Sequence, residues 1–253
     1  AGQWTIFRAK LEGANSGFFI KDENENRYLI KFDGYNYPEL TTAAEVIGTK
    51  FFYAAGYTVP ESVITYFDPE KVTIQEGVTV VENGERRPMT MTDYRAIVAK
   101  RPVNQEGKIR ALASKFVAGI PVGPWNFEGT VKEDPNDRVA HEHRRELRGM
   151  RVISSWLNDT DRRDANTMAV YNDSGYIDHY VQDFGNTLGA NGTSIHKPIQ
   201  GQAYLIDPRY MLVSALSLGG YVTPWETIEA EVPYPAAGYF RAYVFKPGRW
   251  VPT

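Results

Sequence analysis

Three polar residues in the second half of the chain have the types and spacing for phosphoryl-transfer chemistry. Asp161 is followed by four residues and then by Asn166, and Asp183 begins the sequence Asp-Phe-Gly. An Asp in the first position can orient an attacking hydroxyl or take its proton, and the Asn can hold a metal ion. The Asp183 carboxylate can hold Mg²⁺ against nucleotide phosphates. Because Mg²⁺ prefers oxygen ligands and keeps several waters, one carboxylate and one amide are enough when phosphates supply the rest.

The segment between these residues predicts a hairpin that would bring them together. Residues 167–171 (Thr-Met-Ala-Val-Tyr) predict a short strand, residues 172–175 (Asn-Asp-Ser-Gly) a tight turn, and residues 176–181 a returning strand. Such a hairpin places Asn166 and Asp183 side by side at its open end. Two unrelated polar loops remain the plainer reading, because Asp and Asn are common in turns.

A lysine in an apolar strand and a glutamate in the next helix form a second candidate group. Residues 28–32 read Tyr-Leu-Ile-Lys-Phe, and Lys31 is costly there without an anionic partner. A helix is predicted to follow, with Pro38 and Glu39 in its first turn, Gly56 at its C-cap, and Glu45 within it. Its apolar residues recur at helical spacing: Leu40, Ala43, Ala44, Ile47 and Phe51. A solvent-facing edge lysine and a solvated surface glutamate are the plainer readings.

A small-residue turn precedes these elements. Strands are predicted over residues 4–10, 18–21 and 27–32, with a turn at 11–17 that contains Gly13, Ser16 and Gly17. Small residues let backbone N–H groups approach phosphates closely. The pattern departs from Gly-x-Gly-x-x-Gly, so an ordinary hairpin turn explains it equally well.

The order of these motifs, over about residues 10 to 190, resembles the protein-kinase-like superfamily. Within it, the atypical branch of phosphoinositide 3-kinase-type lipid kinases and HipA-type toxin kinases carries Asp-Arg-His-x-x-Asn. The chain matches that motif at Asp161, Arg162 and Asn166, and has Arg163 where the branch has His. This departure puts in doubt any step in which the His would assist the proton or contact the phosphate.

The resemblance implies a role for each residue. Glu45 would pair with Lys31 and hold it on the α- and β-phosphates, and Asp161 would serve as base or orienter. Asn166 and Asp183 would be the metal ligands. Arg162 or Arg163 would offset developing phosphate charge.

The fold implied is α+β: a two-lobed kinase-like fold whose N-terminal antiparallel sheet carries one key helix, with a mainly helical C-terminal lobe. The N-terminal nucleotide-binding lobe would span 1–122 and the C-terminal catalytic lobe 123–253. A central strand is predicted over 111–122, a hinge over 119–126, and a long helix over 141–157 that leads into the Asp161 loop. An incomplete C-terminus is one reading of the short second lobe.

We therefore expect a phosphotransferase that uses ATP with Mg²⁺ or Mn²⁺ and acts on a hydroxyl acceptor. The residues do not show whether that acceptor is a protein, a lipid or a small molecule. Three alternatives stay open: a nucleotide-binding pseudokinase that works as an interaction module, an AMP transferase on the same fold, and a plain α+β binding domain.

Composition bounds these expectations. The 253 residues are ample for a core, and the net charge of −3 gives no case for nucleic-acid binding through bulk charge. The absence of Cys excludes disulfides, Cys-ligated zinc and a thiol nucleophile. No apolar run reaches transmembrane length.

The cytoplasm is the default expectation for a protein that uses ATP, and an extracytoplasmic location stays open. A charged first helical turn explains the acidic and histidine residues at 141–146 better than a metal site does.

Overall fold

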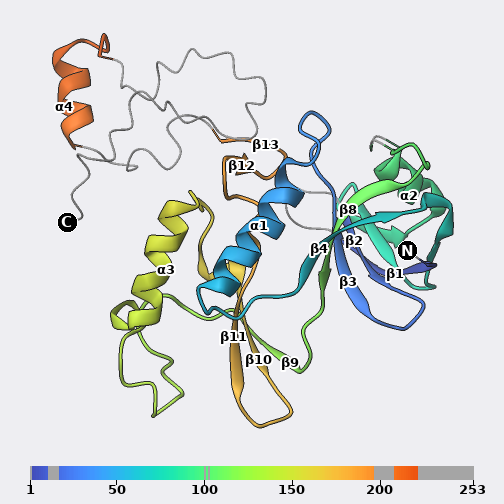
Figure 1. Ribbon diagram of the computed structural model, residues 1–253, viewed down its shortest axis with the longest axis horizontal. Helices are drawn as coiled ribbons and strands as arrows, with labels where there is room; N and C mark the ends of the chain where they lie inside the picture. The colour runs from blue at the N-terminus through green and yellow to red at the C-terminus, as the bar shows by residue number, and fades with distance from the viewer. Residues whose placement is uncertain (1, 11–16, 100, 102, 197–207, 222–253) are drawn as a thin grey trace.

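The computed structural model describes residues 2–10, 17–99, 101, 103–196 and 208–221 of a mixed α/β protein (Figure 1). Its larger sheet has six strands in the order β4-β8-β3-β2-β1-β5, and every neighbouring pair is antiparallel except β1 and β5. The strands are β1 (Trp4–Ala9), β2 (Gly17–Lys21), β3 (Arg27–Lys31), β4 (Ser62–Phe67), β5 (Val72–Ile74) and β8 (Ile109–Lys115). The three strands predicted at the start of the chain are confirmed.

One face of this sheet forms the first core. Alternate residues of the strands, such as Ile6, Phe18 and Ile30, are fully buried there, as the two-residue period of a strand requires. Tyr94 and Val98 of α2 (Met91–Val98) complete this core, and a capping box fixes the start of α2. A short 3-10 turn, η1 (Pro69–Lys71), precedes β5, and the hairpin of β6 (Thr79–Glu82) and β7 (Glu85–Pro88) leads to α2.

Helix α1 (Leu40–Ala54) lies between the large sheet and the rest of the described chain (Figure 1). It ends in a Schellman motif: the N–H groups of Gly56 and Tyr57 donate to the carbonyls of Tyr53 and Phe52, and Gly56 has φ +92°. The predicted apolar stripe is only partly buried, because Ile47 and Phe51 are 42% and 39% exposed. The inner face of α1 instead consists mainly of small and polar residues: Thr41, Thr42, Ala44, Glu45, Gly48 and Thr49.

A second, three-stranded sheet has the order β11-β10-β9. Its strands are β9 (Ile120–Gly123), β10 (Thr167–Tyr171) and β11 (Ile177–Val181). The hairpin predicted over 167–181 is confirmed, and its register pairs Thr167 with Val181. The single strand predicted over 111–122 is wrong, because β8 ends at Lys115 and β9 pairs with β10 in the other sheet. Gly119 lies between them with φ +107°, a conformation that interrupts a strand.

The helix predicted over 141–157 is divided. A 3-10 turn, η2 (His141–His143), is followed by α3 (Arg145–Trp156), because Arg144 has an extended backbone with ψ 133°. The other elements are η3 (Asp164–Asn166), β12 (Ala190–Asn191), β13 (Ser194–Ile195) and α4 (Pro208–Leu216). In the described residues from 123 onward, two α-helices accompany the short strands, so a mainly helical C-terminal lobe is not supported. None of the helices described combines the length and apolar character needed to cross a membrane.

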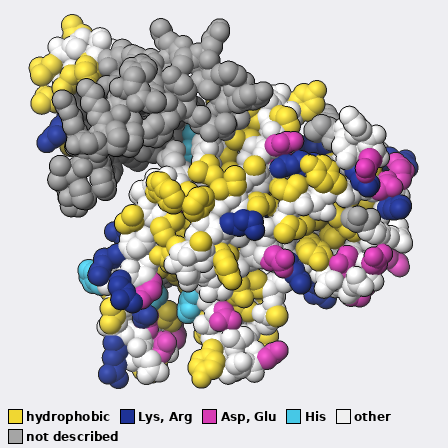
Figure 2. Space-filling view, in the orientation of Figure 1, with side chains coloured by type: hydrophobic (Ala, Val, Ile, Leu, Met, Phe, Trp, Pro, Cys, Tyr) yellow, Lys and Arg dark blue, Asp and Glu magenta, His cyan; other side chains and the backbone are white. Residues whose placement is uncertain are grey.

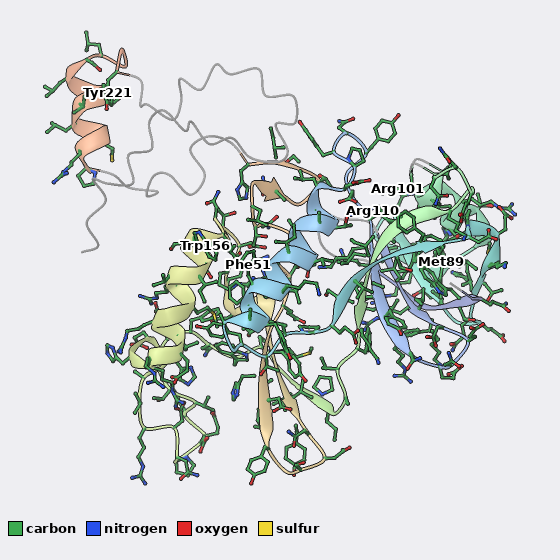
Figure 3. The ribbon with its side chains drawn as sticks, viewed as in Figure 1. Phe51, Met89, Arg101, Arg110, Trp156 and Tyr221 are labelled. Carbon is green, nitrogen blue, oxygen red and sulfur yellow. The ribbon has the colours of Figure 1, made fainter. Side chains whose placement is uncertain are left out.

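Helices α1 and α3 meet over a second core. Phe52 of α1 packs there with Trp125, Met150, Leu157 and Phe184, and Leu147 and Ile153 of α3 pack against the same core. On the outside of the same junction, Phe51 and Trp156 form an edge-to-face pair with ring centroids 5.0 Å apart (Figure 3). Hydrophobic side chains gather on this surface (Figure 2). The second core fixes α1 against the segment that carries Asp183.

Candidate active site

The ammonium group of Lys31 lies between two carboxylates from distant parts of the chain. Its Nζ is 3.3 Å from Oε2 of Glu45 on α1 and 3.0 Å from Oδ1 of Asp183, which follows β11. The Lys31 and Glu45 side chains are 10% and 4% exposed, whereas the Asp183 side chain is 49% exposed. The predicted pairing of Lys31 with Glu45 is therefore present, and Lys31 also contacts Asp183.

Burial and charge act in opposite directions on this cluster. Burial disfavours the Lys31 charge, but the carboxylates of Glu45 and Asp183 outweigh it and raise the pKa of Lys31. Burial raises the pKa of Glu45 despite the nearby ammonium group. Although burial opposes its charge, Lys31 and Arg162 lower the pKa of Asp183, so Asp183 is the carboxylate held ionised. An ionised, half-exposed carboxylate is suited to a metal ion.

A buried network around Asp33 fixes the start of α1. The Asp33 carboxylate accepts hydrogen bonds from the Thr42 backbone N–H, from Thr42 Oγ1, both at 2.8 Å, and from Arg110 Nη1 at 2.9 Å. The Thr42 N–H belongs to the first turn of α1 and has no partner within the helix. Asp33, which lies outside the helix, therefore acts as its cap. Asp33 lies two residues after Lys31 and Thr42 lies three before Glu45. The network therefore sets the position of α1 relative to β3.

The Asp-Phe-Gly segment packs against α1 at very short range. A Cβ atom added to Gly48 would lie 2.7 Å from Phe184 Cβ, and one added to Gly185 would lie 2.9 Å from Thr41 Cγ2. Thr187 Oγ1 donates to the carbonyl of Ala44 at 3.3 Å. Asp183 itself has φ +60°, a left-handed conformation that non-glycine residues adopt mainly at constrained, often functional positions. The absence of side chains at both glycines lets the loop bring Asp183 to Lys31.

The Asp161 loop lies at the open end of the β10–β11 hairpin. Asn166 Nδ2 donates to the Asp161 carbonyl at 2.7 Å and to Asp161 Oδ2 at 3.2 Å, and Asn186 Nδ2 donates to the same Oδ2 at 3.2 Å. Arg163 Nε lies 3.0 Å from Asp161 Oδ1. The backbone N–H of Gln182 donates to the Asn166 carbonyl at 3.0 Å, which joins the two candidate segments. Both Asp161 oxygens thus have partners, whereas Asn166 Oδ1 makes no hydrogen bond within the described chain.

Arg162 and Arg163 differ although they are adjacent. The Arg162 side chain is 8% exposed, pairs with Asp159 at 2.8 Å, and donates to the carbonyls of Asn166, Gln182 and Asp183. Its guanidinium carbon lies 4.7 Å from the centre of the Phe184 ring. Arg163 is 66% exposed. Arg162 therefore holds the two loops together, and only Arg163 is placed to meet a ligand.

The remaining predicted site residues have varied outcomes. Gly13 and Ser16 lie outside the described residues. Gly17 is in β2, where an added Cβ would lie 2.0 Å from the Ile30 carbonyl oxygen, so strand packing alone requires glycine there. His141 is hydrogen-bonded to Asp137 and to the Asn126 carbonyl. Within the described chain, no cluster of three or more His, Asp or Glu residues is arranged to hold a metal ion.

Sequence reasoning missed Asp33, Arg110 and Asn186. Asp33 and Arg110 are 77 positions apart, and Asp33 caps a helix that begins seven residues later, so neither matches a local capping pattern. Asn186 had a weak signal, because it directly follows Asp-Phe-Gly and can reach back to the neighbouring loop.

Comparisons with known proteins give little further information. No family model matches the chain, and no curated protein matches it. Among solved structures, it is similar to the proinflammatory kinase CtkA of Helicobacter pylori, with a TM-score of 0.37 and 14% sequence identity. The match covers 70% of this chain and 57% of CtkA. A similarity this distant carries no argument about activity.

Proposed function

We propose that the protein is a kinase-like phosphotransferase that uses ATP with Mg²⁺ or Mn²⁺ and acts on a hydroxyl acceptor. The observation that carries the proposal is the contact of Lys31 with both Glu45 and Asp183, which lie 14 and 152 positions away in sequence. Nothing local forces these three residues to meet. A lysine held by a helix glutamate next to the Asp-Phe-Gly aspartate is the arrangement that phosphoryl transfer in kinases requires.

The residues fit a divalent cation bound together with nucleotide phosphates. Asp183 offers a half-exposed ionised carboxylate, and Asn166 offers an amide oxygen without a hydrogen-bond partner in the described chain. These are the oxygen ligands that Mg²⁺ prefers. When bound, the cation would neutralise charge on the transferred phosphoryl group.

The protein's own residues would perform the other tasks. Lys31 would contact phosphate oxygens, with Glu45 limiting its movement. Asp161 would orient the acceptor hydroxyl or accept its proton once Arg163 releases Oδ1, and the exposed Arg163 could then contact the phosphoryl group. Asn186 and Asn166 would keep Asp161 in place through Oδ2.

A second candidate is a nucleotide-binding pseudokinase. It is favoured by one observation: Arg163 and two amide groups already contact both oxygens of Asp161, so an acceptor hydroxyl would have to compete with them for the carboxylate. In that case the protein would bind ATP and the metal without transferring phosphate.

Thermal unfolding tests the shared part of both proposals. ATP at about one hundred times its Kd should raise the free energy of unfolding by about 2.7 kcal/mol, and only with Mg²⁺ or Mn²⁺ present. Asp183→Ala should abolish that stabilisation, whereas Asp173→Ala, at the exposed turn of the same hairpin, should retain it. Equal stabilisation with and without metal would contradict the site.

Incubation with ATP labelled at either the α- or the γ-phosphate then tests transfer. Label from the γ-phosphate on an acceptor supports the phosphotransferase, and label from the α-phosphate would indicate AMP transfer. Asp161→Ala should abolish transfer while ATP binding persists. Tight binding of Mg-ATP by the wild-type protein with no transferred label would favour the pseudokinase.

A further inference from the structure

Strand β4 forms one edge of the large sheet, and no described strand pairs with its outer side (Figure 1). Its pairing with β8 runs without a register shift, and Glu61, directly before β4, accepts a backbone hydrogen bond from Lys115 at 2.8 Å. In an antiparallel pair such bonds fall on every second residue, so Thr65, further along the same strand, also bonds to β8. Ile64 and Tyr66, on either side of Thr65, turn their N–H and C=O groups away from the sheet. These groups have no backbone partner in the described chain.

The other sheet edges in the described chain are protected in ways that β4 is not. Shortness, charge and proline keep natural edges from pairing with other strands. β5 has three residues and β12 and β13 have two each, β9 contains Pro121, and β11 carries Asp178 and His179. The β6–β7 hairpin carries charged residues on both strands. By contrast, β4 reads Ser-Val-Ile-Thr-Tyr-Phe, with no charge, no proline and no bulge. It is therefore the edge best suited to accept another strand.

A cavity of about 210 Å³ borders β4 on one face of the sheet. Val63 and Thr65 line it, together with three buried residues of the first core: Trp4, Ile20 and Ile30. It is smaller than typical small-molecule sites, which measure about 300–1,000 Å³, so it suits a single side chain. Paired residues of neighbouring strands share a face, so a residue placed opposite Val63 or Thr65 would project on the side of this cavity. Val63, which is 42% exposed, would be covered by it.

We propose that β4 binds an extended peptide as an added strand, with an apolar side chain at every second position. A row of free backbone N–H and C=O groups is satisfied by another extended backbone, and pockets for alternate side chains give specificity. The proposal uses none of the phosphotransfer residues.

The short length of the open edge favours a peptide over a second copy of this chain. Ser62 also turns outward but is only 6% exposed, whereas Tyr66 is 44% exposed, so the open stretch runs from Ile64 to Tyr66. A stable interface between two folded proteins takes about 20–30 residues from each partner. A peptide needs only the strand itself.

Selection from a phage-displayed library of random peptides of about six residues, the usual length of a strand, tests the site. Enriched peptides should alternate apolar with other residues, and a synthetic copy should bind Tyr66→Pro at least about tenfold more weakly than the wild type. Proline removes the outward N–H, and an edge strand tolerates it because that N–H makes no bond within the sheet. Tyr66→Ala keeps the N–H and should retain binding, and circular dichroism checks that both variants fold. Absence of enriched peptides, or equal binding to the wild type and Tyr66→Pro, would overturn the proposal.

Amide hydrogen exchange in the wild-type protein tests the same edge without a substitution. The Ile64 and Tyr66 amides should exchange fast in the free protein and at least about tenfold more slowly with the peptide bound, whereas the Thr65 amide should be slow in both states. Protection confined to other segments would contradict an added strand.

Two controls distinguish this edge from the catalytic loop and from self-association. Asp183→Ala should leave peptide binding unchanged, even if the proposed phosphotransfer site fails every test of its own. Binding that Asp183→Ala removes would make the peptide an acceptor at that site and overturn the proposal. Sedimentation should show a monomer at the concentrations used. A dimer that Tyr66→Pro dissociates would replace the peptide with a second copy and also overturn it.

Discussion

Two of the ion pairs in the candidate active site lie in very different surroundings. Lys31 and Glu45 are almost completely buried, with side chains 10% and 4% exposed, whereas Arg163 and Asp161 are 66% and 30% exposed. The buried pair joins a strand to a helix, and the exposed pair joins two residues of one loop. Removing one member of a buried pair leaves an unpaired charge away from water, whereas an exposed pair exchanges its partner for water.

This difference separates what the protein fixes from what it can change. Lys31 has two carboxylate partners, which hold it in position without a ligand. Arg163 is held by one partner at the surface, so a phosphate group can compete for it. We therefore expect substitutions of the Lys31–Glu45 pair to affect activity most. Substitutions in the Asp33 network should affect stability, and substitutions of the Arg163–Asp161 pair should affect mainly the chemical step.

The largest effect is expected from Lys31→Met. Met suits the apolar strand, so the protein should remain folded, although less stable because Glu45 loses a buried partner, and the proposed phosphate contact is lost. Removal of one positioned electrostatic contact typically lowers kcat about 10²–10³-fold, or about 2.7–4 kcal/mol. Circular dichroism and a γ-phosphate transfer assay check both points. Lys50→Met, on the exposed side of α1, is the matched control and should be close to wild type. Activity of Lys31→Met within a few-fold of that control would rule out the phosphate role.

How far the sequence predicted this site depends on the range of the interactions. The hairpin at 167–181 was predicted to within a residue, because alternation and a turn sequence are local signals. The meeting of Lys31 with Glu45 was inferred from the order of motifs, and the structure places the two side chains together. The roles of these residues remain predictions. The turn with Gly13 and Ser16 lies outside the described residues.

Predictions failed where tertiary contacts override a local pattern. The stripe of α1 was expected to bury Ile47 and Phe51, but the inner face of the helix belongs to the site and carries Thr41, Glu45 and Gly48. Apolar periodicity does not identify a buried face that consists mainly of small and polar residues. Similarly, no spacing rule joins Asp33 to Arg110, because their contact depends on how β3, β8 and α1 meet.

An intermediate effect, on stability, is expected from Arg110→Met. Asp33 would keep its hydrogen bonds to Thr42 but lose its cation, and the side chains of Arg110 and Asp33 are only 14% and 11% exposed. Loss of a hydrogen bond to a charged group should lower the free energy of unfolding by about 1.5–3 kcal/mol. Denaturant unfolding measures it, with Lys108→Met as the control, because that lysine pairs with Glu106 at the surface and should change stability by under about 1 kcal/mol.

A double variant shows whether the Asp33 network acts through charge. Adding Asp33→Asn to Arg110→Met removes the unpaired carboxylate and should recover part of the lost stability, since an amide oxygen can still accept from the Thr42 backbone N–H. If the two substitutions are simply additive, the ion pair does not hold the start of α1, and the coupling inferred between β3 and α1 fails.

The smallest effect on stability is expected from Arg163→Gln. The pair with Asp161 is exposed, so its loss should change the free energy of unfolding by no more than about 1 kcal/mol. Catalysis should respond more strongly. Arg163 is exposed, unlike the neighbouring Arg162, and can therefore contact a phosphoryl group. A fall in kcat of about tenfold, with KM for ATP little changed, would correspond to an interaction made in the transition state and worth about 1.4 kcal/mol. Arg163→Lys should restore part of the activity, since it keeps the charge without the guanidinium fork. An increase in kcat for Arg163→Gln would instead mean that the arginine restrains Asp161, and would assign it an inhibitory role.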